Sequence, residues 1–199
     1  MEQLKILLLL LCFSVNVPFV FSQNRIQWRT MTEVQELAKA QKRKVMVDVF
    51  TDWCGWCKQM DKTTFQNSAI VKFINENYYA VRFNAEHKED ITFKERLYKF
   101  NSAGGRKGYH ELASDLLKGR MSYPTVVFLD EDLNVIQPIP GYSDAPKFEA
   151  IINYFAGDHY KKTPWSTFEK NFKCGSPIPT TIQPAQQAPR GNKMVGNRQ

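Results

Sequence analysis

The stretch that most constrains this chain is residues 45–60, VMVDVFTDWCGWCKQM. Its first part, 45–50, is a short apolar run rich in β-branched residues, which predicts a buried central strand whose one polar member is Asp48. Cys54 and Cys57 follow soon after it, separated by a Gly-Trp dipeptide. Cysteine pairs with this spacing serve as a redox dithiol, as half of a metal site or as a structural staple.

The position of the pair makes its two sulfurs unequal. Cys54 opens the predicted helix, where backbone amides lack partners and the helix dipole is positive, so its thiolate is stabilised. Cys57 lies one turn later, near enough to close a disulfide but tucked beneath the first sulfur. The pattern predicts an exposed nucleophile at Cys54 and a resolving thiol at Cys57, which exchange disulfides through a mixed disulfide.

A metal site and a purely structural disulfide fit the sequence less well than a redox dithiol does. A structural zinc site needs about four ligands, and here Cys174 and a histidine would have to be recruited from far along the chain. The histidines are His87, His110 and His159. A disulfide that closes so short a loop constrains the unfolded chain little. We therefore expect no metal, and we interpret Cys174 as a neutral, partly buried thiol rather than an intermolecular link.

The N-terminal segment predicts export. In residues 1–22, Lys5 precedes an apolar run, and the segment ends in Val-Phe-Ser, which is typical of a secretory signal. An uncleaved membrane anchor is the alternative, but the run is short and is interrupted by Asn16 and Pro18. We expect a periplasmic or secreted protein with no stable membrane insertion after cleavage, in a compartment where disulfides form.

The remaining chain divides into one domain, 23–174, and a tail, 175–199. The tail is rich in Pro and Gln without periodicity, which predicts disorder. The chain has a formal charge of +7, and three basic residues with no acid fall in the tail. Because the other basic residues alternate with acids along the predicted helices, the sequence predicts no nucleic-acid surface.

Alternating helical and strand patterns predict an α/β domain with a mixed central sheet. The clearest helix starts are a capping box from Thr30 to Glu33 and caps at Asn67, Asp144 and Thr163. Strands are expected at 45–50, 78–86 and 123–130 and, at an edge because of its prolines, in VIQPIPG. ITFKERLYKFN and YHELASDLLK are two further helical candidates, joined by the glycine-rich SAGGRKG.

Two motifs carry a family resemblance. VDVFTDWCGWCK resembles the active-site segment of the thioredoxin superfamily, and YPTVVFLD resembles the loop that enters a strand through a cis-proline. With the signal, the chain is most similar to exported thioredoxin-like proteins and to the C-terminal domain of periplasmic disulfide-interchange reductases. The resemblance covers about residues 25–160. It implies a thioredoxin fold, in which the segment from Glu86 to Arg120 adds a helical insert before the cis-proline strand.

The resemblance also assigns roles to individual residues. Cys54 would attack the substrate, Cys57 would resolve the mixed disulfide, and the two would pair with each other. Pro124 would follow a cis bond, which an X-Pro sequence makes accessible, although an ordinary trans proline at a strand start is the alternative. The substrate-binding surface would comprise Trp53, Trp56, Tyr123 and Pro124.

Asp48 is expected to act as a proton carrier. A carboxylate in an apolar strand is costly to ionise, so its pKa should be raised, and it can take the proton of Cys57. The family has an Asp six positions before the first Cys, and Asp48 has that spacing. The alternative is a strand-end Asp facing solvent. Arg82 could be its charged neighbour, or an arginine that simply reaches solvent.

The sequence therefore predicts an extracytoplasmic thiol–disulfide oxidoreductase that reduces or exchanges disulfides in exported proteins. It would need no cofactor and would receive electrons from a partner such as a membrane-bound reductase. The absence of a His between the cysteines favours a reductase over a strong oxidant. Two alternatives stay open: a binding or chaperone module without redox turnover, and a disulfide oxidase or isomerase.

Overall fold

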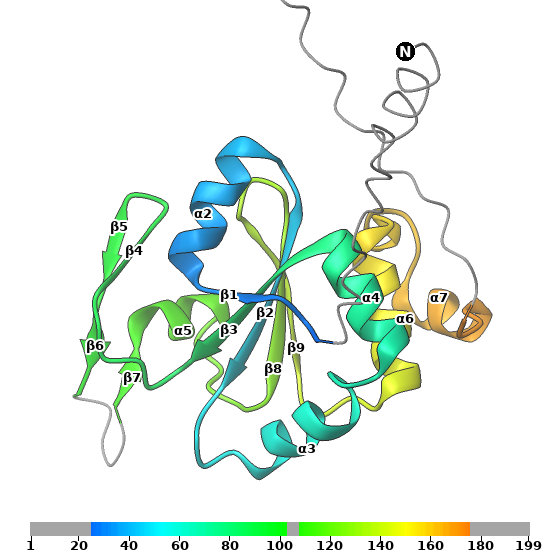
Figure 1. Ribbon diagram of the computed structural model, residues 1–199, viewed down its shortest axis with the longest axis horizontal. Helices are drawn as coiled ribbons and strands as arrows, with labels where there is room; N and C mark the ends of the chain where they lie inside the picture. The colour runs from blue at the N-terminus through cyan, green and yellow to red at the C-terminus, as the bar shows by residue number, and fades with distance from the viewer. Residues whose placement is uncertain (1–24, 103–107, 176–199) are drawn as a thin grey trace, which may run out of the picture.

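The computed structural model describes residues 25–102 and 108–175 (Figure 1). The predicted signal at 1–22 and nearly all of the predicted tail at 175–199 lie outside the described residues, as does most of the SAGGRKG loop. Within the two described ranges, no helix has both the length and the apolar character needed to cross a bilayer.

A five-stranded mixed sheet forms the centre of the fold, in the order β1-β3-β2-β8-β9. β1, β2 and β3 are parallel to one another, whereas β8 is antiparallel to β2 and β9 is antiparallel to β8. The predicted apolar strand is indeed the central one, and the proline-containing strand lies at an edge. The strands are β1 (Trp28–Arg29), β2 (Lys44–Phe50), β3 (Tyr78–Asn84), β8 (Thr125–Leu129) and β9 (Val135–Pro140).

Helices cover both faces of this sheet (Figure 1). One face carries Met46 of β2 and Phe128 of β8 and packs against α3, α4 and α6; there Phe128 stacks on Phe155 with ring centroids 4.2 Å apart. The other face packs against α2 and α5. The helices are α2 (Met31–Ala40), α3 (Gly55–Thr63), α4 (Ser68–Asn77), α5 (Glu111–Leu116), α6 (Ala145–Ala156), the 3-10 turn η2 (His159–Lys161) and α7 (Trp165–Asn171).

Most predicted helix starts are confirmed. Thr30 and Glu33 form the reciprocal capping box of α2, Asn67 caps α4 and Asp144 caps α6. The predicted Thr163 cap of α7 is wrong by one residue. Pro164 has an extended ψ of 142° and is itself the residue before the helix, so the helix begins only after it.

The helix expected in ITFKERLYKFN is wrong. The segment is a β-hairpin of β4 (Ile91–Phe93) and β5 (Arg96–Tyr98), whose turn residues Lys94 and Glu95 have φ of 50° and 64°. Two successive left-handed residues make the tight turn that joins antiparallel strands. Neither residue is Gly or Asn, the types that favour a left-handed backbone, so the sequence shows no turn signal.

The rest of the insert before β8 combines strand and helix. A second short hairpin pairs β6 (Phe100–Asn101) with β7 (Tyr109–His110). The helix predicted in YHELASDLLK is confirmed as α5, which begins directly after β7. The insert is therefore only partly helical, and Figure 1 shows it beside β3 and α2.

Candidate active site

Cys54 and Cys57 form a disulfide at the start of α3, with their Cα atoms 5.3 Å apart. Cys54 is the residue before the helix, and its Sγ accepts a hydrogen bond from the Cys57 N–H at 3.0 Å. The Cys54 N–H donates to the carbonyl of Thr51, which fixes the loop between β2 and α3. A sulfur that accepts from a helix N-terminal amide is placed where a thiolate is stabilised.

Both cysteines are buried in this disulfide form. Cys54 is 5% exposed and Cys57 is 3% exposed, so the expectation of an exposed sulfur at Cys54 is wrong for the oxidised state. The physical reason is that the sulfur turns toward Cys57 and the first turn of α3. The flanking indoles are exposed instead, Trp53 by 53% and Trp56 by 62%.

Aromatic side chains flank the disulfide on two sides. Trp53 meets Tyr123 edge to face with ring centroids 5.8 Å apart, and its Nε1–H donates to Glu86 Oε1 at 3.1 Å. Trp56 lies against Tyr142, with centroids 5.4 Å apart. Burial first, and then the charge of Glu86, raises the pKa of Tyr123 to about 12, so its hydroxyl stays protonated at neutral pH.

A shallow groove extends this surface on the Trp56 side, lined by Gly55, Trp56, Gln59 and Tyr142. The sequence reasoning missed Glu86 and Tyr142. No local signal could have found them, because folding alone brings Glu86 to Trp53 and Tyr142 to Trp56.

The Tyr123–Pro124 peptide bond is cis, as the sequence predicted. Pro124 is buried, and Thr125 directly after it pairs with Val49 of β2. This antiparallel register brings Pro124 to the end of β2 that leads into the cysteine loop. Segments far apart in the sequence thus meet at one end of the sheet.

Asp48 is buried in the central strand, 1% exposed, so the solvent-facing alternative is wrong. Burial raises the pKa of its carboxyl to about 7, while Arg82 acts to lower it and Asp61 to raise it. Among the described residues, Asp48 Oδ1 has no hydrogen-bond partner. The carboxyl therefore exchanges a proton near neutral pH.

Arg82 is the charged neighbour of Asp48. The two residues pair in register across β3 and β2, and Arg82 Nε lies 3.9 Å from Asp48 Oδ2. The guanidinium also donates from Nη2 to Asp61 of α3. The sequence reasoning missed Asp61, although its position four residues after Cys57 on a helix would place it one turn beyond that thiol.

The remaining cysteine and histidines do not join this site. Within the described part of the chain, no cluster of His, Cys, Asp and Glu is suited to a metal ion. His110 is buried, and its Nδ1 accepts the Leu112 N–H at the start of α5. Cys174 is exposed, so the expectation of a partly buried thiol is wrong. Partial desolvation of its sulfur and then the charge of nearby Glu149 nevertheless raise the pKa of its thiol.

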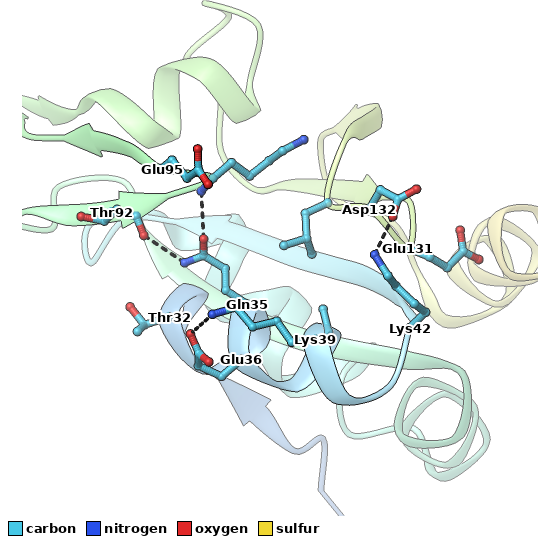
Figure 2. Close-up of a pocket in the computed structure, with 12 residues that line it drawn as sticks. Thr32, Gln35, Glu36, Lys39, Lys42, Thr92, Glu95, Glu131 and Asp132 are labelled. Carbon is cyan, nitrogen blue, oxygen red and sulfur yellow. Dashed lines mark hydrogen bonds and ion pairs between the residues drawn. The ribbon is translucent and has the colours of Figure 1, made fainter. Parts of the chain in front are cut away.

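A second pocket, of about 510 Å³, lies at the other end of the sheet, between α2, the β4–β5 turn and the β8–β9 turn (Figure 2). Two pairs of its charged side chains form ion pairs. Lys39 pairs with Glu36 at 2.7 Å and Lys42 with Asp132 at 2.6 Å, and Gln35 donates to the carbonyl of Thr92. We therefore place the candidate active site at the disulfide and not at this pocket.

Comparisons with known proteins identify the family and the fold of this chain. A family model described as a thioredoxin-like domain matches residues 31–156. The thiol:disulfide interchange protein DsbD of Yersinia pestis is 30% identical over 115 residues, which is 56% of this chain and 16% of that protein. The uncharacterized protein B0495.5 of Caenorhabditis elegans is 28% identical over 116 residues, 58% of this chain and 14% of that protein. The chain thus matches only a small part of these relatives.

A solved structure supports the fold. A thioredoxin-fold protein from Helicobacter pylori matches with a TM-score of 0.50 and 17% sequence identity, over 65% of this chain and 83% of that one. The mixed sheet with helices on both faces is thus a thioredoxin fold.

Proposed function

Because this chain belongs to the family of thioredoxin-like domains, we propose that it is a thiol–disulfide oxidoreductase that reduces or exchanges disulfides in exported proteins. The observation that carries the proposal is the Cys54–Cys57 disulfide. It lies at the N-terminus of α3, soon after the strand in which Asp48 is buried. A disulfide with this placement has one sulfur suited to attack and a second suited to resolve.

The reaction follows from these groups. In the reduced protein, the Cys54 thiolate attacks one sulfur of a substrate disulfide; that S–S bond breaks, and one substrate thiolate leaves and takes a proton from water. The Asp48 carboxylate takes the proton of the Cys57 thiol, and the new thiolate attacks the Cys54 sulfur and releases the second substrate thiolate. The substrate gains two electrons and the protein dithiol loses them. A dithiol donor then reduces the Cys54–Cys57 disulfide again.

The surface around the disulfide suits an extended polypeptide. Trp53 and Trp56 offer exposed apolar area on both sides of the sulfurs. Tyr123 and Pro124 border the same end of the sheet, and the Tyr123 backbone would pair with the substrate chain, as an added strand does. Such backbone pairing would accept many protein substrates.

The location and the electron source complete the proposal. The signal-like segment at 1–22 directs the protein to the periplasm or outside the cell, where a membrane-bound reductase would supply electrons. The thiol:disulfide interchange protein DsbD is one of the relatives of this chain. No bound cofactor takes part in the exchange.

An insulin reduction assay tests the activity. With dithiothreitol as electron donor, the wild-type protein is expected to accelerate precipitation of the insulin B chain, and Cys54→Ser is expected to abolish the acceleration. Cys174→Ser is the matched control and should retain full activity, because Cys174 is an exposed free thiol that takes no part in the Cys54–Cys57 disulfide. Equal rates with and without the wild-type protein would refute the proposal.

The direction of electron flow needs a second measurement. Equilibration of the Cys54–Cys57 disulfide with a glutathione buffer gives its reduction potential. A reductase is expected to lie near thioredoxin, at roughly −270 mV, whereas a value near −120 mV would indicate a strong oxidant and thus the oxidase alternative.

A binding or chaperone module is the second candidate, and the exposure of Trp53 and Trp56 favours it. The two candidates differ in their need for Cys57. A Cys57→Ser variant of a redox enzyme accumulates mixed disulfides with its substrates, which non-reducing electrophoresis of an envelope extract detects. A pure binding module forms none and keeps its binding when both cysteines are replaced.

A further inference from the structure

Three ionisable side chains from three elements meet between the central sheet and α3. Asp48 of β2 and Arg82 of β3 face each other in neighbouring strands, and Asp61 comes from α3. Arg82 Nη2 donates a hydrogen bond to Asp61 Oδ2, whereas Arg82 Nε remains 3.9 Å from Asp48 Oδ2. That distance is too long for a hydrogen bond. The guanidinium is thus bonded to Asp61 and only electrostatically paired with Asp48.

The environments of the two carboxyls differ. The Asp48 side chain is 2% exposed, whereas Asp61 and Arg82 are 26% and 31% exposed. The guanidinium carbon also lies 4.6 Å from the ring centroid of Phe50 and 5.8 Å from that of Trp28, contacts that favour a cation. Asp61 and the two rings therefore hold the Arg82 guanidinium on the more solvent-exposed side of the buried Asp48.

We propose that Asp61 is a positioning residue: by holding the Arg82 guanidinium, it prevents a hydrogen-bonded ion pair between Arg82 and Asp48 and preserves Asp48 as a proton acceptor for Cys57. The catalytic meaning of this inference rests on the proposed function. A carboxylate bonded directly to a guanidinium is a weak base, because the ion pair stabilises the ionised form.

The charges around Asp48 agree with this role. Arg82 is the charged group that β3 presents to it and Asp61 the one that α3 presents, while its partner across β8 is Val126. Asp61 raises the pKa of Asp48 and Arg82 lowers it, so the two act in opposition. The other titratable side chains of α3 are Cys57, which carries no proton in the disulfide form, and the exposed Lys58 and Lys62.

Carboxyl ¹³C NMR of the oxidised protein tests the electrostatic arrangement directly. Asp61→Asn removes the negative charge and weakens the hold on Arg82, so the titration midpoint of Asp48 is expected to fall by about one pH unit. Asp61→Glu keeps the carboxylate and should stay close to the wild-type midpoint. Asp115→Asn, which loses an exposed pair with Arg96, is the matched control and should not change it. An unchanged or higher midpoint in Asp61→Asn would overturn the inference.

The pH profile of insulin reduction tests whether Asp61 acts through Asp48. The rate of insulin reduction is expected to increase with pH as Asp48 ionises. Asp61→Asn should move the midpoint of that increase to lower pH by the same amount as the NMR midpoint. In an Asp48→Asn background it should cause no further shift; an equal shift there would overturn the positioning role. The NMR titration needs no turnover. A shifted midpoint in a protein without reductase activity would therefore refute the proposed function and still support the arrangement of Asp61 and Arg82.

Discussion

Ionisation of the buried Asp48 is expected to destabilise the folded protein, and Asp48→Asn should reverse that effect at alkaline pH. Burial raises the pKa of Asp48 from 3.8 to about 7. Between those values the folded state holds a proton that the unfolded chain has lost, so stability falls as pH rises from about 4 to about 7 and is level above that. The difference of about 3 pKa units corresponds to about 4 kcal/mol.

Asparagine has nearly the same shape as aspartate and carries no charge at any pH. Asp48→Asn is therefore expected to raise the free energy of unfolding by up to about 4 kcal/mol near pH 8 and to change it little near pH 4. Urea unfolding followed by tryptophan fluorescence at both pH values measures the two differences.

Asp115→Asn is the control for that experiment, because Asp115 is paired with Arg96 on the surface and its effect should be small at both pH values. A stability gain of Asp48→Asn that is equal at the two pH values would refute the reasoning. Such a result would mean that the folded protein does not bind a proton at Asp48 in this range.

Three further predictions concern the fold. Phe128→Ala removes a fully buried ring that stacks on Phe155 and should lower the free energy of unfolding by about 3–5 kcal/mol in urea titration; a loss below about 1 kcal/mol would contradict that packing. Asp144→Ala removes the acceptor of the Lys147 N–H at the start of α6 and should cost about 1 kcal/mol by the same assay. Glu95→Gly relieves a φ of 64° in the hairpin turn. It should raise the free energy of unfolding by about 0.5 kcal/mol and so raise the thermal midpoint slightly; a lower midpoint would argue against the hairpin.

The parts of the fold that the sequence predicted correctly depend on short spacings. The capping box of Thr30 and Glu33 lies within one helical turn, and the apolar run around Asp48 lies within one strand. The hairpin at Lys94 and Glu95 was missed because its turn residues carry no side-chain signal for a left-handed backbone. That turn forms because Phe93 and other residues of the hairpin bury against the α2 face of the sheet.

The candidate site divides in the same way. The sequence alone predicted that Cys54 and Cys57 would lie one turn apart at a helix start and that an acid would precede them in the central strand, because these relations need only neighbouring residues. The tertiary structure decided the burial of Cys54, the contact of Trp53 with Glu86 and the sharing of Arg82 between two acids. Burial and charge depend on groups that come from distant segments, so the raised proton affinity of Asp48 exists only in the folded protein.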